Sequence, residues 1–371
     1  MKQDSTKIVW VGMDVHQDSI TAAILCGDES EPEIVRLPGD LNPIRKLFRR
    51  LSKQGVVRGC YEASGAGYVI HRALQNDGFH CEVIAPSLIP RKPGDRRKTD
   101  RLDAINLVRH YRSGNLVAVA VPTEEQEAVR QMIRARLSVQ GHTVRLKHRI
   151  VRTLATHGHR FTGTKSNWTV KHRLWLAQLK RSLTGPLQIV LSFHLEHLEY
   201  LESQKQALDG EIEKYSRQEP WREQVEALRC FRGIKTLTAM TLLTEIGDIR
   251  RFATATGLMA YAGLVPGERS SGEVQRRGAI TKNGSGELRR VLAEAAWQYR
   301  HRSGSTLILQ RRRMGQSPQV VAVAVKAQHR LYKKFHRLSA KKHPCTAVTA
   351  VARELCGFIW SALWTQQTQE A

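Results

Sequence analysis

The chain is 371 residues long, is 41% hydrophobic, and carries a formal net charge of +25 with a sequence pI of about 10.3. This length suits two or three domains, and the hydrophobic content excludes a wholly disordered chain. The basic excess predicts a polyanionic partner, which means DNA or RNA and less often an acidic membrane surface. No apolar run approaches membrane-spanning length, the first residues lack a signal-peptide core, and the six scattered cysteines form no Cys-x-x-Cys pair. We therefore expect a cytoplasmic, reduced protein without a structural zinc site.

The first part of the chain alternates short β-branched runs with amphipathic segments. We expect strands at residues 8–15, 19–25, 33–37, 56–61 and 81–85, and helices at residues 42–54, 67–76 and 100–111. Three hairpin-like strands followed by alternating helix and strand predict an α/β domain with a ribonuclease-H-like fold. We assign this domain to residues 1–116.

Long helices are expected in the middle of the chain, which we assign to residues 117–227. One helix starts at Thr123, a good N-cap followed by several acids, and continues to about His157. Another covers Gly185–Tyr215, whose leucines fall near a heptad seam. This all-α segment is predicted to be a basic, coiled-coil-like linker whose helix pair packs together or dimerises.

Residues 228–371 are predicted to form a mainly α-helical C-terminal domain. A pair of small helices in a helix–turn–helix arrangement is expected at residues 233–248. A Gly/Ser-rich loop follows at residues 267–286, and a helix starts at about Glu287.

Four acidic residues fall where the first domain would bring them together. Asp14 follows the first apolar run, Glu62 closes the fourth strand, and Asp100 and Asp103 lie on one face at the start of a helix. Clustered carboxylates resist ionising together unless a cation compensates them, and hard oxygen ligands favour Mg²⁺ or Mn²⁺. The set predicts a metal site for phosphoryl transfer. Taken singly, Asp100 is also a common helix N-cap, and Glu62 could cap the next helix.

Basic residues predict contacts with a phosphate backbone. Beside the acids lie Arg96, Arg97, Lys98 and Arg101. Residues 128–195 and 295–353 contain no Asp or Glu but thirteen Lys/Arg each, whereas a merely solvated helix face usually has interspersed acids. In these stretches and in the C-terminal domain, the residues expected to bind nucleic acid are Arg145, Lys147, Arg149, Arg152, Lys235, Arg276, Arg277, Lys282, Arg311, Arg312 and Arg313.

Two adjacent serines, Ser270 and Ser271, lie in the C-terminal loop among basic residues. On composition alone, Ser-Ser-Gly-Glu is an ordinary loop, and a serine hydroxyl is a weak nucleophile until a base or metal activates it. The sequence offers no Ser-His-Asp or Gly-x-Ser-x-Gly arrangement as an alternative nucleophile site. The fifteen histidines show no metal-ligand pair beside an acid, so we expect surface or phosphate-contacting roles for them.

Motifs at both ends of the chain resemble those of a known family. The N-terminal motifs are Gly12-Met-Asp14-Val-His16, Tyr61-Glu62-Ala-Ser-Gly65 and Lys98-Thr-Asp100-Arg-Leu-Asp103. The C-terminal motifs are Tyr261-Ala-Gly-Leu-Val-Pro266, Ser270-Ser271-Gly272 and Gly278-Ala-Ile-Thr-Lys282-Asn-Gly284. Together they resemble the DEDD insertion-sequence transposases, the bacterial family named for insertion sequence one-hundred-and-ten and described as bridge-RNA-guided recombinases.

The resemblance implies a RuvC-like N-terminal domain in which the four acids bind the metal, and a serine nucleophile in the C-terminal domain. Because the family's serine directly precedes a glycine, the resemblance selects Ser271 over Ser270. It also implies donor and target DNA as substrates, a structured non-coding guide RNA, and a homodimer or homotetramer. One departure is Lys235, which stands where the family often has a glycine and would contact phosphate by charge.

Three functional hypotheses follow. The first is a recombinase that cleaves and rejoins DNA with both the metal site and Ser271. The second is a structure-specific nuclease, such as a junction resolvase, which uses the carboxylates alone and forms no covalent protein–DNA bond. The third is a non-catalytic nucleic-acid-binding protein whose acids only balance local charge.

Overall fold

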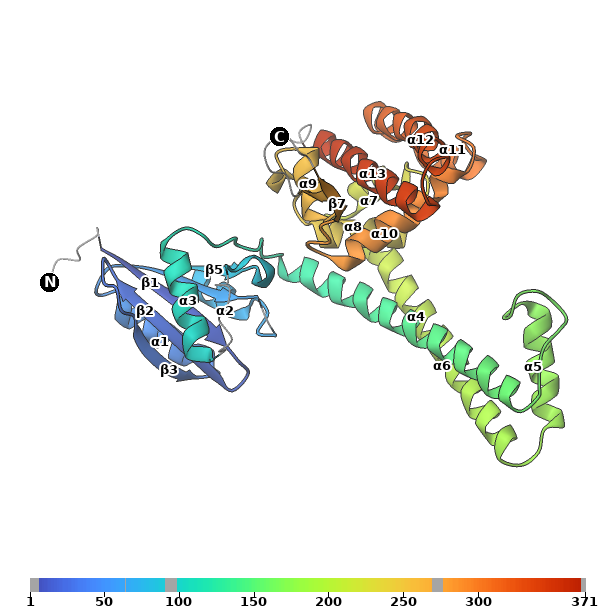
Figure 1. The fold of residues 1–371 in the computed structure, drawn as a ribbon, viewed down its shortest axis with the longest axis horizontal. Helices are drawn as coiled ribbons and strands as arrows, with labels where there is room; N and C mark the ends of the chain where they lie inside the picture. The colour runs from blue at the N-terminus through green and yellow to red at the C-terminus, as the bar shows by residue number, and fades with distance from the viewer. Residues whose placement is uncertain (1–6, 64, 91–98, 269–275, 368–371) are drawn as a thin grey trace. The chain divides into compact units, whose positions relative to one another are not determined.

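The computed structural model of the chain describes residues 7–63, 65–90, 99–268 and 276–367. The chain divides into two compact units, Met1–Pro122 and Thr123–Ala371. The first unit is α/β and the second is mainly helical, which confirms the expected α/β N-terminal domain and the expected helical remainder of the chain (Figure 1). None of the helices in the described ranges is both long and apolar enough to cross a bilayer.

A five-stranded sheet forms the centre of the first unit. Its strands are β1 (Ile8–Val15), β2 (Ser19–Cys26), β3 (Glu33–Pro38), β4 (Val56–Glu62) and β5 (His80–Ile84). Their order is β3-β2-β1-β4-β5, with β1, β2 and β3 antiparallel to one another and β4 and β5 parallel to β1. All five predicted strands are confirmed within one residue at each end.

Helices cover both faces of this sheet. Alternate residues of β1, including Val9, Val11 and Met13, pack in one core with α1 (Leu41–Leu51) and α2 (Val69–Asn76). The opposite face is covered by α3 (Asp100–Arg112), whose Ala104 and Val108 pack on β2. Because side chains along a strand alternate between faces, Trp10, Gly12 and Asp14 of β1 all face α3.

Glycine at position 12 allows α3 to lie directly on β1. A Cβ atom at Gly12 would lie 2.5 Å from the amide nitrogen of Val108 and 2.9 Å from the carbonyl oxygen of Ala104. Both of these atoms belong to the α3 backbone, which cannot rotate away as a side chain could. The absence of a side chain at Gly12 therefore sets the distance between the helix and the strand.

Residues 117–119 belong to the first unit. The amide of Val119 donates to the carbonyl of Val83 (2.7 Å), and Ala118 forms an isolated antiparallel bridge with Ile84. This stretch therefore lines the outer edge of β5, whereas the sequence analysis had assigned it to the helical linker. Its sequence, Val-Ala-Val-Ala-Val followed by Pro122, is a short apolar run that the sequence analysis did not interpret as part of the sheet.

The second unit begins with a helical hairpin. α4 (Glu124–Thr156) starts at a capping box, in which Thr123 accepts from the amide of Gln126 and the Gln126 side chain accepts from the amide of Thr123. It packs against α6 (Gly185–Tyr215), and α5 (Val170–Ser182) lies between them in sequence. Buried leucines of α6, including Leu191, Leu198 and Leu201, form one core with α4 and α5. The heptad seam thus has a partner within its own chain.

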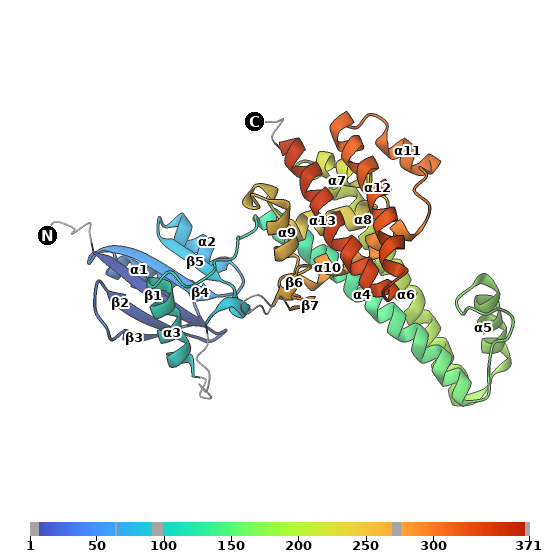
Figure 2. The same cartoon turned by 45° about the horizontal axis from the view of Figure 1, so that its top comes forward.

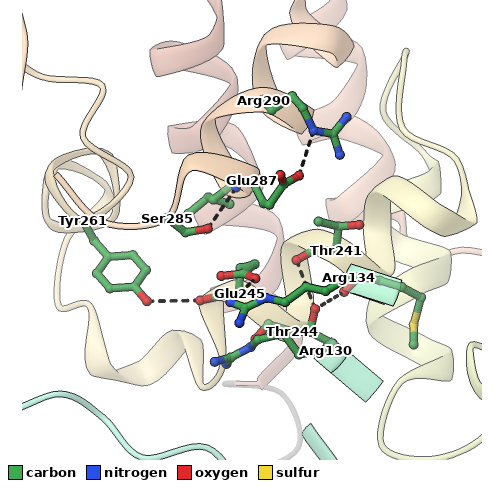
Figure 3. Close-up of polar contacts among 11 residues, drawn as sticks. Arg130, Arg134, Thr241, Thr244, Glu245, Tyr261, Ser285, Glu287 and Arg290 are labelled. Atoms are coloured by element: carbon green, nitrogen blue, oxygen red, sulfur yellow. Dashed lines mark hydrogen bonds and ion pairs between the residues drawn. The ribbon is translucent and has the colours of Figure 1, made fainter. Parts of the chain in front are cut away.

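Arginines of α4 attach the hairpin to the rest of the second unit (Figure 3). Arg130 donates to the carbonyl of Thr244 (2.9 Å), and Arg134 pairs with the buried carboxylate of Glu245 at 3.1 Å. The hydroxyl of Tyr261 donates to the carbonyl oxygen of Glu245 (3.1 Å). Arg130 and Arg134, which belong to the first acid-free stretch, are therefore engaged in contacts within the protein.

The remaining elements pack around a single large apolar core (Figure 2). They are α7 (Arg222–Arg229), α8 (Thr236–Ile246), α9 (Ala255–Tyr261), β6 (Pro266–Glu268), β7 (Arg277–Ile280), α10 (Gly286–Ala296), α11 (Leu307–Arg313), α12 (Pro318–Ser339) and α13 (Pro344–Gln367). Two expectations about the C-terminal domain need correction. Residues 236–246 form one helix rather than a helix pair, because Met240–Ile246 continues the helix that begins at Thr236. The expected loop at residues 267–286 includes parts of two antiparallel strands, β6 and β7.

Replacing Gly12 with alanine should displace α3. The overlap with the α3 backbone should cost about 1–3 kcal/mol, as over-packing usually does. We expect the amides of α3 to exchange with deuterium faster in Gly12→Ala than in the wild type, as measured by mass spectrometry. Gly65→Ala is the control, because a Cβ at Gly65 meets nothing within 4 Å. Equal protection of α3 in both variants would contradict the account of this contact.

Candidate active site

The carboxyl ends of β1 and β4 bring two of the predicted acids to one edge of the sheet. These strands are parallel, with Met13 paired to Tyr61, so Asp14 and Glu62 are the next residues on neighbouring strands. Both side chains line a cleft of about 520 Å³ at this edge, together with His16 and residues of α1 and α2. The register of β1 on β4 thus accounts for their shared position.

Helix α3 adds a third acid. Thr99 caps the helix by accepting from the amide of Leu102 (3.3 Å), which fixes Asp100 in the first turn. The positive end of the helix dipole favours an acid at that position. Ligand atoms of Asp14, His16 and Asp100 lie within 4.8 Å of one another. The structure therefore brings together two of the four predicted acids and adds a histidine.

His16 lies between the two carboxylates. Its Nε2 is 3.3 Å from Oδ2 of Asp14 and 3.6 Å from Oδ1 of Asp100. The sequence analysis expected only surface or phosphate-contacting histidines, so this residue was missed. The available signal was the spacing Asp14-x-His16, because residues two apart on a strand share a face.

Asp14 is the most enclosed member of the group, with its side chain 14% exposed. Burial raises the pKa of its carboxyl, the neighbouring His16 opposes this shift, and the charges of Asp103 and Asp100 raise the pKa further. Within the described residues, its buried Oδ2 atom accepts no hydrogen bond, since His16 lies at ion-pair distance without hydrogen-bond geometry. An enclosed carboxylate oxygen that lacks a hydrogen bond is what a bound cation would satisfy.

Glu62 and Asp103 lie near this group without joining it. Glu62 reaches the same cleft, and the buried Tyr61 beside it donates to the carbonyl of Gly67 (2.9 Å). This bond ties down the turn that follows Glu62. Asp103 is half-buried on α3, one turn after Asp100, and acts on Asp14 through its charge.

The predicted basic residues of α3 and α4 differ in their surroundings. Arg101 is exposed in the first turn of α3, and Arg96, Arg97 and Lys98 lie outside the described residues. On α4, Arg145, Arg149 and Arg152 are exposed. Lys147 instead pairs with Glu202 of α6 (2.7 Å) and lies over the ring of Trp168, so it contributes to packing of the hairpin.

The predicted serine pair lies outside the described residues, and so does Arg269. The flanking strands β6 and β7 are described, with Arg276 exposed just before β7 and Arg277 at its start. Lys282 follows β7 with a positive φ of 59°, and its amide donates to the carbonyl of Gly263 (3.1 Å). Lys235 is the exposed N-cap residue of α8.

The three consecutive arginines at the end of α11 have unequal roles. Arg312 donates to the carbonyl of Ile234 (3.2 Å), and Arg313 donates to the carbonyl of Cys230 (3.0 Å) and to the side chain of Gln328 (2.9 Å). These bonds fasten α11 to the turn before α8. Only Arg311 of the three is exposed.

Comparisons with known proteins identify the family of the chain. Residues 11–158 match the DEDD transposase family, and residues 225–309 match the family described as "Transposase IS116/IS110/IS902 family". The chain is 37% identical over 360 residues to a Sinorhizobium fredii protein described as a transposase, covering 95% of this chain and 87% of that protein. The chain belongs to the IS116/IS110/IS902 family of transposases. It is therefore an enzyme that cleaves and rejoins DNA.

Two further relatives carry the names of insertion-sequence transposases. The chain is 34% identical over 340 residues to one from Leptospira borgpetersenii, which covers 90% of this chain and 97% of the relative. It is 24% identical over 273 residues to one from Yersinia enterocolitica, which covers 70% of this chain and 77% of the relative. The resemblance noted from the motifs is thereby confirmed at the level of the family. The first matched segment includes Asp14, Glu62, Asp100 and Asp103.

Two isosteric substitutions in the first unit should change its stability in opposite directions. Because the pKa of Asp14 is raised in the folded protein, its stabilising contribution is present at low pH and is lost as the pH rises through the folded pKa. At pH 7 in chelator, Asp14→Asn should therefore raise the melting temperature. Hydrogen bonds from Arg45 lower the pKa of Asp77, so this group stabilises the fold at neutral pH and Asp77→Asn should lower the melting temperature. A fall in both variants would contradict the account of Asp14.

Proposed function

We propose that this transposase cleaves DNA with a Mg²⁺- or Mn²⁺-dependent site built on Asp14, Glu62, Asp100 and Asp103. The observation that carries the proposal is the convergence of Asp14 and Asp100, with His16, on one edge of the sheet. Two of these acids come from elements 85 residues apart in sequence, so helix packing rather than local chain geometry brings them together. A purely charge-balancing role would not require an enclosed carboxylate oxygen without a hydrogen bond.

The strand arrangement supports a RuvC-like, ribonuclease-H-like assignment of the first unit. Three antiparallel strands followed by two parallel strands are the order from which the sequence analysis inferred that fold. In a sheet of this kind, the carboxyl ends of β1 and β4 lie at one edge, which places Asp14 and Glu62 there. The site thus depends on the topology and not only on the motifs.

The chemistry of the ligands fits a hard divalent cation. Mg²⁺ binds oxygen at about 2.1 Å, so two of its ligands can lie up to about 4.2 Å apart, and the present separations need only small adjustments. Asp14 and Asp100 would hold the ion, Glu62 and Asp103 would complete or extend the site, and His16 would either bind the ion or orient the carboxylates. A bound divalent ion supplies Lewis acidity to the reacting phosphate and lowers the pKa of an attacking hydroxyl or water.

Side chains of the chain itself would hold the scissile phosphate. Arg101 is exposed one residue after Asp100, and the positive end of α3 points its first amides to the same region. Arg96, Arg97 and Lys98 precede them in sequence. These cations offset the negative charge of the acids, which would otherwise repel a phosphodiester.

We assign the nucleophile to Ser271 on the sequence pattern and the family membership. The serine oxygen would replace one ester oxygen at the scissile phosphorus. The serine would lose its proton and the departing sugar oxygen would gain one. This exchange keeps one phosphoester bond for another, so rejoining needs no nucleotide cofactor, in keeping with a sequence that lacks a Gly-Lys-Ser/Thr loop.

We also assign a structured guide RNA and self-association to this protein, on the same resemblance. The exposed row formed by Arg145, Arg149 and Arg152 supports an RNA surface on α4, since these residues recur at helical spacing and α4 carries no acid beyond Glu127. Lys147 is left out of this surface because it is engaged with Glu202. The self-association that the resemblance implies is a homodimer or a homotetramer.

Neutralising one metal ligand should abolish DNA cleavage. Asp14→Asn and Asp100→Asn should each lower single-turnover cleavage at least about 100-fold while leaving DNA binding in chelator intact, because a carboxylate ligand is lost without any basic contact. Wild-type cleavage should require Mg²⁺ or Mn²⁺. The control is Asp28→Asn, an exposed acid in the β2–β3 turn, which should cleave normally. Cleavage by the wild type in chelator would refute the metal site.

Ser271→Ala should stop strand exchange and remove a covalent protein–DNA adduct, whereas Ser270→Ala should do neither. The measurement is to quench reactions with denaturant, digest the protein and map the phosphoserine linkage by mass spectrometry. An adduct on Ser270 would reassign the nucleophile. Undiminished recombination without any adduct in the double alanine variant would favour the nuclease-like hypothesis, in which the carboxylates act alone.

A further inference from the structure

The outer face of α12 carries a row of cations that is distinct from every basic residue considered so far. Its inner face buries apolar residues such as Leu331, and the helix packs side by side with α13 in the second unit (Figures 1 and 2). On the outer face Lys326, His329, Lys333 and Arg337 are exposed. Within the described part of the chain, Lys326, Lys333 and Arg337 form no ion pair.

The spacing of this row follows the helix. Lys326, Arg330, Lys333 and Arg337 recur at intervals of four, three and four residues, so all four lie on one stripe of the surface. At 1.5 Å per residue the row is about 16 Å long. The same residues line a groove of about 700 Å³, whose other wall includes Glu354 of α13.

Glu354 organises this groove without neutralising it. The carboxylate, which is 13% exposed, pairs with both Arg330 and Lys334. One acid thereby holds two cations in fixed positions, and it is the only acid among the residues that line this groove. The lining as a whole therefore keeps a net positive charge.

We propose that this face of α12 binds the phosphodiester backbone of duplex DNA. Three of the four cations in this regular row, Lys326, Lys333 and Arg337, lack an acidic partner among the described residues. Such a row complements the dense, regular charge of a duplex, which carries one negative charge per about 1.7 Å of its axis. The proposal rests on the DNA-cleaving function, which makes DNA the polyanion that the enzyme must hold. α12 lies outside residues 11–158 and 225–309, so the family matches do not cover this surface.

In residues 295–353, the sequence had led us to expect nucleic-acid contacts from Arg311, Arg312 and Arg313. Arg312 and Arg313 donate to backbone carbonyls inside the unit and are not available as a pair to a ligand. The exposed cations of the same stretch lie instead on α12. The DNA surface is thus inferred from the exposed, unpaired cations Lys326, Lys333 and Arg337 of α12 and not from the densest run of arginines.

The test is the salt dependence of binding to a fluorescently labelled, 20-base-pair DNA duplex, measured in chelator by anisotropy with the full chain. Each phosphate contact contributes about 0.9 to the slope of log K against log salt. The triple variant Lys326→Gln/Lys333→Gln/Arg337→Gln should therefore reduce that slope by about 2.7 and weaken binding at 0.1 M salt about tenfold or more.

The control for net charge is Lys46→Gln/Arg50→Gln/Lys53→Gln, which removes three exposed cations from the C-terminal half of α1 and the turn just after it. It changes the net charge equally but should leave the slope within about 0.5 of the wild-type value. An equal loss in both triple variants would mean that total charge alone matters and would overturn the α12 site. An unchanged slope in the α12 variant would overturn it as well.

Two further measurements distinguish DNA binding by α12 from RNA binding and from a dependence on the metal site. If the α12 variant loses affinity for an RNA hairpin but not for DNA, the assignment to DNA is wrong. Because binding is measured without metal, it does not depend on cleavage. If wild-type cleavage proves independent of metal while the slope still falls, the proposed metal site fails and the α12 surface stands.

Discussion

Helix α3 can reach Asp14 only because position 12 of β1 carries no side chain. The backbone of α3 occupies the space where a Cβ atom of Gly12 would lie, and this contact brings the capped first turn of the helix to the end of the strand. Asp100 then lies beside Asp14 and His16, and like charges accumulate near an enclosed carboxylate. Burial and the charges of Asp103 and Asp100 raise the pKa of Asp14, so keeping this carboxylate ionised at neutral pH opposes folding.

Charge has two separate uses in the second unit. Arg130, Arg134 and Arg313 donate to carbonyl or carboxylate groups of neighbouring elements. Such charge-assisted bonds are strong enough to fasten one helix to another. The exposed cations Arg145, Arg149 and Arg152 of α4 and Lys326, Lys333 and Arg337 of α12 form no such bond among the described residues, so they remain available to a polyanion. The net charge therefore indicates that the protein binds a nucleic acid, and the packing of the helices determines which cations are exposed to bind it.

Much of the fold was predictable because its signals are local. Short apolar runs located all five strands, and the capping residue Thr123 located the start of α4. The N-cap of α3 is Thr99 and not Asp100, which lies in the first turn. The site was predictable only in part. The shared position of Asp14 and Glu62 follows from the parallel register of β1 and β4, and the spacing Asp14-x-His16 was a local signal that was overlooked. The approach of Asp100 to Asp14 depends instead on how closely α3 packs on β1, which no local pattern encodes. The inward turn of Arg312 and Arg313 was missed for the same reason: their partners, Ile234 and Cys230, are about 80 residues away.

The central claim is that the contact at Gly12 assembles a cation site from β1 and α3. It is tested most directly by crystallising the protein with Mn²⁺ and recording anomalous diffraction at the manganese edge. The account predicts an anomalous peak within about 2.0–2.3 Å of carboxylate oxygens of both Asp14 and Asp100. It predicts no peak there in Gly12→Ala crystals, in which α3 is displaced. A peak bound by neither carboxylate, or an undiminished peak in the Gly12 variant, would contradict the account.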